Sequence, residues 1–317
     1  MKAVVLAAGE GKRMRPVSDK IPKIMIPILD KPFLEYIIME LKEAGIKDII
    51  IVVSQKNGDF IKDYFKDGGG MGLKIDYVVQ EHRNGTADAI SRARKYLEDC
   101  DYFLVHYGDS LTNVNLPLKL IENFKKHENL DAYLTLREEE NTSRYGVVKF
   151  EGKNIVDIIE KPEKGKEPSN MVTVGIFILK TKSFFDSIKG MGFEYGKEEF
   201  PAEYIIRKGG KVRGFLFSGK RVDLGKPVDI LNTTKLVMLK FFSSDSDYYI
   251  GEKVITGKNS IIKESFINRD TSIGENFMLE NSYVMGNCTI GNNCRVKNSI
   301  ICCDLEDGEV VEDEVRV

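Results

Sequence analysis

The first 32 residues combine a buried strand, a glycine turn and a cluster of cations. Ala3 to Ala8 is an unbroken apolar run, which predicts a short strand buried on both faces. The run ends at Gly9 and Gly11, which lack a Cβ and let the backbone turn tightly and approach a ligand. Backbone amides in such a turn can surround an anion, and basic residues follow at once: Lys12, Arg13, Arg15 and Lys23. This order predicts a fold built on a buried strand, with a triphosphate site where that strand ends.

Single positions exclude two common phosphate-binding loops. The dinucleotide fingerprint G-x-G-x-x-G needs a third glycine at position 14, which is Met14. The P-loop G-x-x-x-x-G-K-[ST] needs a glycine at position 6 and a hydroxyl at position 13, where Leu6 and Arg13 stand. The opening turn therefore belongs to another kind of phosphate loop.

Apolar runs alternate with amphipathic stretches through the first third of the chain. We expect strands at 49–53, 75–79 and 102–107, and helices at 33–44, 60–65 and 86–97, the last capped by Thr86. Such alternation predicts an α/β fold, a mostly parallel sheet with helices on both faces. Ligands bind beyond the carboxyl ends of the strands in such sheets, and the glycine turn lies at such an end.

Short strands dominate after residue 131 and suggest a second, β-rich lobe. We expect them at 132–136, 146–150, 155–159 and 172–179, and then a helix near 199–208 and a further strand at 212–217. Glu160 can accept hydrogen bonds from sugar hydroxyls, and Lys161 can pair with a monophosphate as a point charge. The alternative interpretation of this pair is a solvated strand end.

Two aspartates are candidate ligands of Mg²⁺. Asp109 follows Gly108 at the tip of the strand at 102–107, and Asp223 precedes a tight turn into a helix expected at 227–240. Magnesium prefers carboxylate oxygens and bridges to substrate phosphates. The pair predicts a metal site beside the phosphate loop.

The tail repeats apolar residues every six positions, with one step of five. They are Ile255, Ile261, Ile267, Ile273, Leu279, Met285, Ile290 and Val296. A six-residue period predicts a parallel β-helix, here of two to three coils. Because no histidine follows His127, we read the tail as a packing or assembly surface rather than an acyltransferase. An exposed coil end would favour a homo-oligomer.

Composition limits the partners and the compartment. The formal net charge of −2 argues against a nucleic-acid partner, and no apolar stretch reaches the ~20 residues that would imply a membrane partner. Five cysteines, with Cys302 and Cys303 adjacent, argue against a disulfide scaffold and for a reducing cytoplasm. A buried strand at the N-terminus also argues against a signal peptide.

The complete motif at the start of the chain is a more specific indicator of family than its two glycines alone. L-A-A-G-x-G-x-R-x-x-P, followed by P-K and K-P, resembles the signature of the sugar-1-phosphate nucleotidyltransferases, or NDP-sugar pyrophosphorylases. One departure is Lys12, where many members carry Thr. The resemblance covers about 1–240, and the tail matches the left-handed β-helical extension of many members. It implies a Rossmann-like nucleotidyltransferase domain at 1–226, a connecting helix and linker at 227–250, and the short β-helix at 251–317.

The resemblance also implies roles for individual residues. Arg13 would hold the leaving pyrophosphate and Lys23 the α-phosphate, with Asp109 and Asp223 on Mg²⁺. The nucleotide set would be Leu6, Ala7, Gly9, Gly11, Lys12, Gln80, Gly85 and Thr86, with Gln80 and Gly85 at the base. The sugar phosphate would meet Gly146, Glu160, Lys161 and Gly175.

The expected reaction joins an NTP to a sugar 1-phosphate and releases pyrophosphate. Gly85-Thr86-Ala87 after Gln80 resembles uridylyl and guanylyl members more than thymidylyl ones. We favour UTP with glucose 1-phosphate or N-acetylglucosamine 1-phosphate. Thymidylyl or guanylyl transfer to glucose or mannose 1-phosphate stays open, and so does a non-catalytic regulatory subunit that binds nucleotide sugars.

Overall fold

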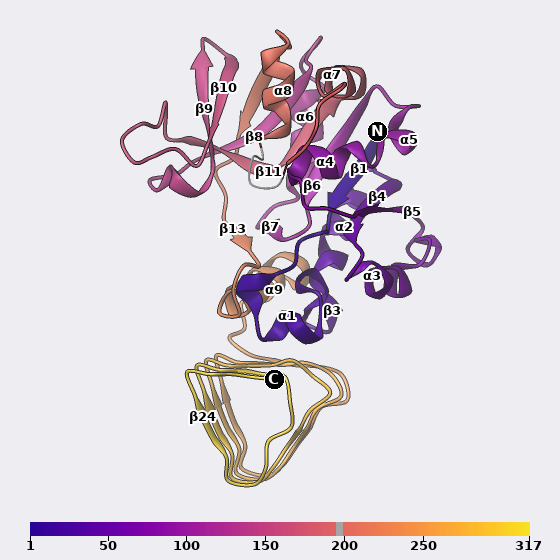
Figure 1. Ribbon diagram of the computed structural model, residues 1–317. Coiled ribbons are helices and arrows are strands. Elements are labelled where there is room, and N and C mark those ends of the chain that lie inside the picture. The colour runs from indigo at the N-terminus through magenta and orange to yellow at the C-terminus, as the bar shows by residue number, and fades with distance from the viewer. Residues whose placement is uncertain (195–198) are drawn as a thin grey trace. The chain divides into compact units, whose positions relative to one another are not determined.

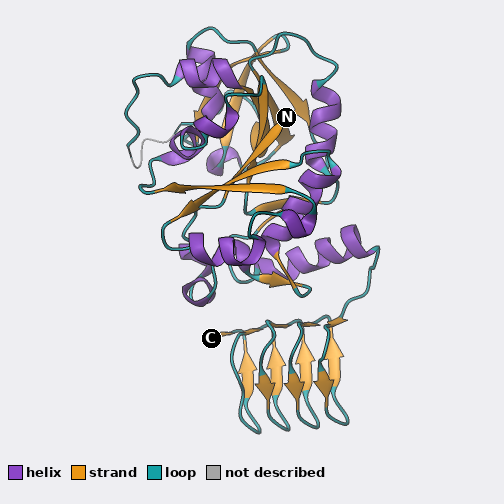
Figure 2. Ribbon diagram, turned by 90° about the vertical axis from the view of Figure 1, so that its right-hand side faces the viewer, coloured by secondary structure: helices purple, strands orange, loops and turns teal. Residues whose placement is uncertain are grey.

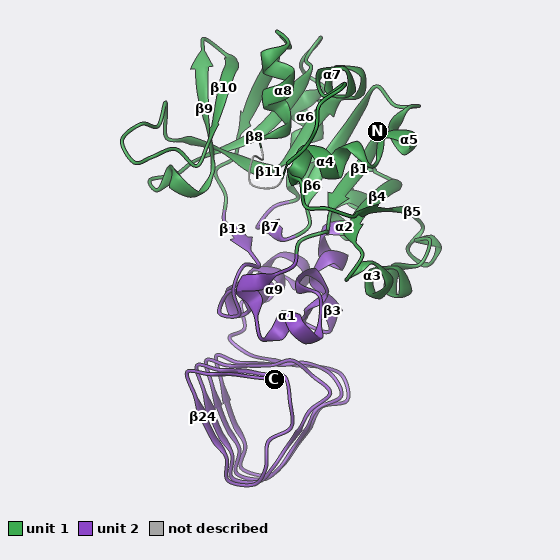
Figure 3. Ribbon diagram, viewed as in Figure 1, with its two compact units in different colours: residues 1–9, 38–108, 115–219 green, residues 10–37, 109–114, 220–317 purple. Residues whose placement is uncertain are grey.

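The computed structural model describes residues 1–194 and 199–317. The chain divides into two compact units, shown in Figure 3. Unit 1 holds residues 1–9, 38–108 and 115–219, and unit 2 holds residues 10–37, 109–114 and 220–317. The chain passes from unit 1 to unit 2 inside the predicted motifs, after Gly9 and after Gly108. The domain boundaries at 226 and 250 rest on sequence pattern and stay a prediction.

Unit 1 contains the predicted parallel strands. They lie in the order β6 (Tyr102–Tyr107), β1 (Lys2–Leu6), β4 (Asp48–Ser54) and β5 (Lys74–Gln80). Val4 of β1 pairs with Ile50 on one side and Val105 on the other, and all pairs in this half are parallel. A strand with neighbours on both edges and helices over the sheet is buried, which explains the unbroken apolar run at 3–8.

The β-rich half joins the same sheet, so the prediction of a second lobe is wrong. Strand β11 (Met171–Lys180) pairs antiparallel with β6, for example Ile176 with His106, and its other edge pairs with β8 (Ala132–Glu138). Strands β9 (Gly146–Glu151), β10 (Asn154–Glu160) and β12 (Val212–Leu216) complete a nine-stranded mixed sheet within the described residues. The apolar length of β11 allows it to reach three other strands.

Helices cover the sheet on either side, as Figure 2 shows. They are α2 (Phe33–Glu43), α3 (Gly58–Phe65), α4 (Gly85–Ser91), α5 (Arg94–Leu97), α6 (Leu116–Phe124), α7 (Thr181–Ser187) and α8 (Pro201–Arg207). The helix expected at 86–97 is thus two helices, and its predicted cap is wrong. Asn84 occupies the cap position without a side-chain hydrogen bond, and the Thr86 hydroxyl lies instead 3.3 Å from the Tyr107 hydroxyl. Among the described residues, no helix combines the length and apolar character needed to cross a membrane.

Unit 2 begins with short elements that carry the cationic loop. These are η1 (Lys12–Met14), α1 (Val17–Lys20), η2 (Lys23–Met25), β2 (Pro27–Ile28) and β3 (Lys31–Pro32). Strand β7 (Ser110–Thr112), which follows Asp109, pairs antiparallel with β13 (Arg221–Asp223), which ends at Asp223. Helix α9 (Asp229–Phe242) then leads to the tail.

The tail is a β-helix, seen along its axis in Figure 1 as a triangle and from the side in Figure 2 as stacked strands. Its parallel strands form three sheets: β14-β17-β20-β23-β25, β15-β18-β21 and β16-β19-β22-β24. The strands are β14 (Tyr249–Ile250), β15 (Ile255–Thr256), β16 (Ile261–Lys263), β17 (Phe266–Ile267), β18 (Ser272–Ile273), β19 (Met278–Glu280), β20 (Tyr283–Val284), β21 (Thr289–Ile290), β22 (Arg295–Lys297), β23 (Ile300–Ile301), β24 (Val310–Glu312) and β25 (Val315–Arg316). Five strands stack in the first sheet of the described tail, so the predicted two to three coils are too few.

The corners of the coils explain why asparagine recurs. Asn259, Asn276 and Asn293 all have positive φ, which asparagine tolerates better than most residues. Their side chains form a ladder, with Asn259 donating to Asn276 at 3.1 Å and Asn276 donating to Asn293 at 3.0 Å. A coil of 17 residues separates successive members of the ladder. At each corner the asparagine backbone accommodates the positive φ, and the asparagine side chain links one coil to the next.

One face of the tail packs inside unit 2. Phe266, Tyr283 and Ile300 point outward from the first sheet, yet all three are buried. The Tyr283 hydroxyl donates to the carbonyl of Pro27 at 2.9 Å. Asp30 accepts from the backbone of Arg269 at 2.6 Å and from the Tyr249 hydroxyl at 2.9 Å. The tail is therefore anchored to the segment that follows Lys23.

Candidate active site

Lys23 and Asp109 form the centre of the candidate site in unit 2. The Nζ of Lys23 donates to the Oδ2 of Asp109 at 2.5 Å. The Lys23 side chain is mostly buried and that of Asp109 is about a third exposed. Burial disfavours the charged carboxylate, but the charges of Lys23 and Arg221 outweigh that effect and hold the pKa of Asp109 below its usual value. The site keeps an ionised acid beside a fixed cation.

Gly11 is required by the packing around Lys23. Its φ is +68°, and a Cβ at this position would stand 2.9 Å from the Cβ of Lys23. The carbonyl of Gly11 also accepts from the Ser18 hydroxyl at 2.8 Å. A Cβ on Gly9, in unit 1, would meet nothing within 4 Å. The two glycines of the motif therefore differ: protein contacts demand the second, and only a ligand could demand the first.

Asp223, the second predicted acid, lies beside Asp109 through the backbone. It pairs with Ser110 across β13 and β7, and Leu224 donates its N–H to the carbonyl of Asp109 at 2.8 Å. The carboxylate of Asp223 accepts from Arg221 Nε at 2.9 Å and Nη2 at 2.6 Å. Arg221 is two residues away on the same strand, so both side chains lie on the same face.

The remaining cations of the loop are more exposed. Arg13 Nη2 would lie 3.8 Å from a Cβ on Gly225, so this guanidinium lies near the turn after Asp223. Lys12 is exposed and 3.4 Å from Glu10. The structure therefore brings Arg13, Lys23, Asp109 and Asp223 together in unit 2.

The donor chemistry of this cluster fits a divalent ion shared with phosphate. Both carboxylate side chains are partly exposed, at 37% for Asp109 and 41% for Asp223. Within the described residues no group of three or more acidic, histidine or cysteine side chains could hold a metal alone. Magnesium commonly takes one or two carboxylates and completes its shell with waters and substrate phosphates. Two acids beside a cationic glycine loop suit that kind of site.

In unit 1, Gln80 and Gly85 are brought together at the end of β5. The amide nitrogen of buried Gln80 donates to the carbonyl of Gly85 at 3.0 Å and to Asp88 Oδ2 at 2.8 Å. Gly85 has a φ of +90°, which favours glycine. Arg92 pairs with Asp88 at 2.8 Å. Leu6 ends β1, and the carbonyl of Ala7 accepts from Asn57 at 2.8 Å, which fixes the strand end.

Tyr107 links two of the predicted residues. Its hydroxyl lies 3.3 Å from that of Thr86. A Cβ on Gly175 would stand 2.5 to 2.8 Å from three carbons of Tyr107, two in the ring and its Cβ. The Tyr107 side chain thus requires glycine at position 175, a reason that the sequence did not reveal.

The other residues predicted to bind the sugar phosphate form a second group. Gly146 pairs with Glu160 across β9 and β10, and a Cβ on Gly146 would stand 2.9 Å from Glu160 Oε1 and 3.1 Å from Thr173 Oγ1. Exposed Lys161 donates its backbone N–H to the carbonyl of Tyr145 at 2.9 Å. The structure joins Gly146, Glu160 and Lys161 at the ends of two paired strands.

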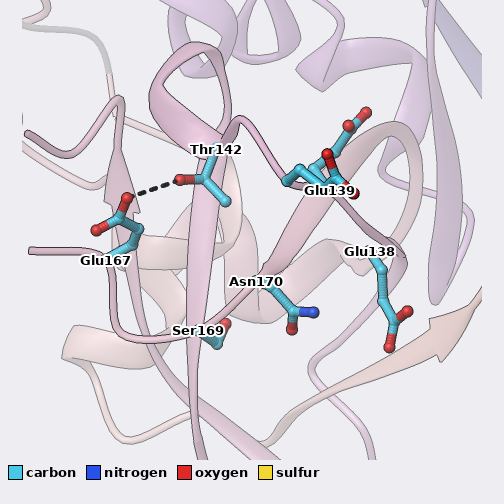
Figure 4. Close-up of a pocket in the computed structure, with 7 residues that line it drawn as sticks. Glu138, Glu139, Thr142, Glu167, Ser169 and Asn170 are labelled. Atoms are coloured by element: carbon cyan, nitrogen blue, oxygen red, sulfur yellow. Dashed lines mark hydrogen bonds between the residues drawn. The ribbon is translucent and has the colours of Figure 1, made fainter. Parts of the chain in front are cut away.

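An acidic cavity of about 710 Å³ is lined by the segment that follows β8 and the one that precedes β11, as Figure 4 shows. None of the predicted site residues lines it. The lining residues are Glu138, Glu139, Glu140, Thr142, Glu167, Ser169 and Asn170. Thr142 donates to Glu167 at 3.5 Å. Four carboxylates repel anions, so this cavity does not suit a phosphate.

Comparison with known proteins decides the family. A family model described as "Nucleotidyl transferase" matches residues 2–238. The chain belongs to this family. The match covers the cationic loop, both aspartates and the whole mixed sheet, and it ends within α9.

Relatives of this nucleotidyl transferase act on several substrates. It is 31% identical to the low-salt glycan biosynthesis nucleotidyltransferase Agl11 of Haloferax volcanii, over 75% of this chain and 66% of that protein. It is 33% identical to the bifunctional protein GlmU of Methanocaldococcus jannaschii, over 84% of this chain and 61% of that protein. A D-glycero-alpha-D-manno-heptose 1-phosphate guanylyltransferase of Campylobacter jejuni is 35% identical, over 72% of this chain and 96% of that protein. The chain thus spans about two thirds or less of the length of the first two.

A solved structure shares the fold. A Bacillus anthracis chain described as a glucose-1-phosphate thymidylyltransferase, crystallised with sucrose, aligns with a TM-score of 0.65 at 24% identity. The alignment covers 74% of this chain and 94% of that one.

Sequence reasoning missed three residues that the structure places among the candidates. Arg221 binds Asp223, Asp88 binds Gln80, and Tyr107 contacts Thr86 and Gly175. Arg221 could have been found, because side chains two apart on a strand share a face. No sequence pattern marks Asp88 or Tyr107, because Gln80 lies on a different element from Asp88, and Thr86 and Gly175 are distant from Tyr107 in the sequence.

Proposed function

We propose that this protein is an enzyme that transfers a nucleotidyl group from an NTP to a sugar 1-phosphate and releases pyrophosphate. The observation that carries the proposal is the cluster in unit 2, where Lys23 contacts Asp109 and Arg13 lies near the turn after Asp223. Cations and acids gathered at one glycine loop are what a triphosphate and its counter-ion require. The family match supports the same class of reaction.

Each group of residues has a proposed role. Lys23 holds the α-phosphate, Arg13 the departing pyrophosphate, and the amides near Gly9, Gly11 and Lys12 the remaining phosphate oxygens. Leu6, Ala7, Gln80, Gly85 and Thr86 bind the nucleoside. Gly146, Glu160 and Gly175 meet the sugar, and Lys161 meets its phosphate.

The chemistry needs charge control rather than a general base. The sugar phosphate oxygen is already an anion, so it attacks the α-phosphorus directly while the bond to the β-phosphate oxygen breaks. The main barrier is repulsion between two anions. Lys23 is held by Asp109 before the substrate arrives, so its charge requires little reorganisation during the reaction. Positioning and charge stabilisation supply the catalysis.

Asp109 and Asp223 are the residues that would hold Mg²⁺. A bound ion would neutralise phosphate charge and orient the transferred group. Lys23 pairs with Asp109 and Arg221 pairs with Asp223, so the charge of each acid is balanced before any ligand binds. This balance suits a site that takes up an ion together with a phosphate.

We favour UTP with glucose 1-phosphate or N-acetylglucosamine 1-phosphate as substrates. The support is the Gln80, Gly85 and Thr86 arrangement together with relatives described as GlmU and as a UTP–glucose-1-phosphate uridylyltransferase. We place the reaction in the cytoplasm, in keeping with five cysteines that are all free thiols. We also propose that the tail assembles the protein into a homo-oligomer.

The test is a panel of UTP, dTTP, GTP and ATP against glucose, mannose and N-acetylglucosamine 1-phosphates, scored by pyrophosphate release. We expect Mg²⁺-dependent release that is highest with UTP, and a nucleotide sugar identified by mass. An Asp109→Asn variant serves as the inactive control. Absence of pyrophosphate with every pair, combined with tight binding of a nucleotide sugar, would instead favour a regulatory subunit and overturn the proposal.

A further inference from the structure

The sheet β16-β19-β22-β24 of the tail turns two columns of side chains outward. Its central residues Leu279, Val296 and Val311 are buried inside the coil. The residues on either side of them therefore point away from the coil, because successive side chains of a strand alternate between faces. This face, called the outer sheet below, consists of Ile261, Lys263, Met278, Glu280, Arg295, Lys297, Val310 and Glu312.

The first column alternates in charge along the coil axis. Lys263 pairs in register with Glu280, Glu280 with Lys297, and Lys297 with Glu312. The column therefore reads plus, minus, plus, minus over an even number of strands. Lys297 already lies 3.8 Å from Glu280 within the chain, so the alternation also stabilises the coil itself.

The second column is largely apolar and exposed. Ile261 is 43% exposed, Met278 38% and Val310 65%, with Arg295 as the remaining member. Contacts between neighbouring coils do not explain apolar side chains on an outward face. The sheet β14-β17-β20-β23-β25 shows what covers such residues elsewhere in the tail, because its outward Phe266, Tyr283 and Ile300 are buried within unit 2.

We infer that the outer sheet is a self-complementary surface that binds a second copy of the same chain. A two-fold axis parallel to the strands reverses the order of the strands in the second copy and sets each column against its own copy. Lys263 then faces Glu312 of the second copy, and Glu280 faces its Lys297. In the other column Ile261 faces Val310 of the second copy, and the Met278 side chain lies against the Arg295 side chain of the second copy.

The order of charges in the first column favours this two-fold arrangement over the alternative one. A two-fold axis along the coil would set one column against the other and place Lys297 opposite Arg295, which brings like charges together. A partner of single-sign charge would meet a repulsive residue at every second strand. The alternation and the apolar column therefore fit a second copy in the reversed orientation.

The area of the face sets the strength of the contact. Four strands about 4.8 Å apart form a small patch compared with the 1,200–2,000 Å² or so of a stable interface. We therefore expect a dimer that dissociates on dilution and weakens in high salt. The inference rests on the assembly role proposed for the tail and does not depend on the catalytic reaction.

The test compares sedimentation velocity of the full chain over a wide concentration series with two reversed variants. One carries Glu280→Lys with Glu312→Lys, and the other Lys263→Glu with Lys297→Glu. Each variant alone sets like charges against each other and is expected to stay monomeric at concentrations where the wild type is dimeric. An equal mixture of the two, one of them affinity-tagged, is expected to restore dimers that contain both chains.

A control for the Glu280→Lys, Glu312→Lys variant makes the same change in net charge but leaves the outer sheet intact. Glu98→Lys with Glu122→Lys alters two exposed residues outside the tail and should dimerise like the wild type. Thermal unfolding of every variant tests folding, and recovery of dimer in the mixture tests it again. A wild type that is monomeric throughout, or reversed variants that still dimerise, would overturn the inference. Pyrophosphate release measured on the same samples is a separate result, so failure of the reaction is distinguished from failure of the interface.

Discussion

Lys23 Nζ lies 2.5 Å from Asp109 Oδ2, although 86 residues separate the two in the chain. Lys23 belongs to η2 after the cationic loop, and Asp109 follows β6. The pair joins the element that should hold phosphate to the one that should hold a metal ion. A mostly buried lysine with one carboxylate partner is fixed in direction as well as in charge.

Removal of either charge should abolish most of the activity. Lys23→Met and Asp109→Asn are each expected to lower kcat by about 10²- to 10³-fold, as loss of one fixed charge-stabilising group does elsewhere. The measurement is pyrophosphate release at saturating NTP, sugar 1-phosphate and Mg²⁺. Lys126→Met, which removes an exposed lysine with no proposed role in the site, is the control and should leave kcat close to the wild-type value. An Asp109→Asn variant with wild-type turnover would remove Asp109 from the site.

The two glycines of the loop should respond differently to the same substitution. Gly11→Ala introduces a Cβ at positive φ and 2.9 Å from Lys23, so it should both destabilise the protein by about 1–3 kcal/mol and lower kcat. Gly9→Ala has open space and should leave the free energy of unfolding within about 0.5 kcal/mol of wild type.

The comparison also tests the phosphate loop itself. If the backbone at Gly9 approaches the nucleotide, Gly9→Ala should raise KM for the NTP although the protein is as stable as the wild type. Chemical denaturation and steady-state kinetics on the same two variants give the answer. Unchanged kinetics in Gly9→Ala would place the nucleotide away from this residue.

Gly175 and Tyr107 should behave as one packing unit. Gly175→Ala places a methyl group against the Tyr107 ring and should destabilise the fold by about 1–3 kcal/mol. In a Tyr107→Leu background the same change should cost much less, because the ring is gone. A double-mutant cycle from denaturation curves measures this coupling. Strict additivity would mean that Gly175 is needed for another reason, such as direct contact with the sugar.

The sequence predicted the parallel half of the fold because that half carries its information locally. Buried parallel strands are continuous apolar runs, and those at 49–53, 75–79 and 102–107 lie within β4, β5 and β6. Asp109 could be placed near the loop by topology, since strand ends meet at one edge of a sheet. The side chains that bind the predicted acids, such as Arg221 on Asp223, are not marked by any comparably strong pattern in the sequence.

The wrong predictions share one physical cause: local sequence patterns do not specify which distant strand or side chain a residue will pair with. Strand β11 could have begun a new sheet, but it pairs with β6. The eight repeating apolar positions span only 255–296, so the first and last strands of the tail, Tyr249–Ile250 and Val315–Arg316, lie outside that count. Thr86 looked like a cap, but its hydroxyl meets Tyr107 instead.

Glu203 should make stability depend on pH near neutrality. Burial raises the pKa of Glu203 to about 7, although Arg207 donates to it at 2.5 Å and acts in the opposite direction. Because the folded pKa lies above the unfolded one, the contribution of this group is fully present below about pH 4.5 and is lost as pH rises through 7. The loss is on the order of 3 kcal/mol at most.

Glu203→Gln imitates the protonated form and should flatten this dependence. We expect the variant to gain on the wild type in free energy of unfolding between pH 5 and pH 8, measured by urea denaturation. Glu163→Gln, at a glutamate whose side chain is 77% exposed, is the control and should track the wild type at both values. Parallel pH profiles for Glu203→Gln and wild type would mean that Glu203 is ionised in the folded protein at neutral pH.

Asp30 should anchor the tail to the segment that follows Lys23. Its carboxylate side chain is 5% exposed and accepts from Arg269 N, Tyr249 Oη and Glu252 N. Asp30→Ala leaves these donors without their acceptor and should lower the free energy of unfolding by about 2–4 kcal/mol. Asp59→Ala, whose side chain is 93% exposed, should change it by less than about 0.5 kcal/mol.

The anchor should matter beyond stability, because the same segment leads back to Lys23, for which we propose a catalytic role. Pro27 and Asp30 both bind the tail and lie four and seven residues after Lys23. Loosening the tail should therefore raise the protease sensitivity of residues 20–32 in Asp30→Ala and lower kcat with little change in KM. Limited proteolysis with mass mapping, and kinetics at a temperature where both proteins are folded, measure the two effects. A variant that melts earlier but keeps wild-type kcat and the wild-type cleavage pattern would show that the tail stabilises the fold without supporting Lys23.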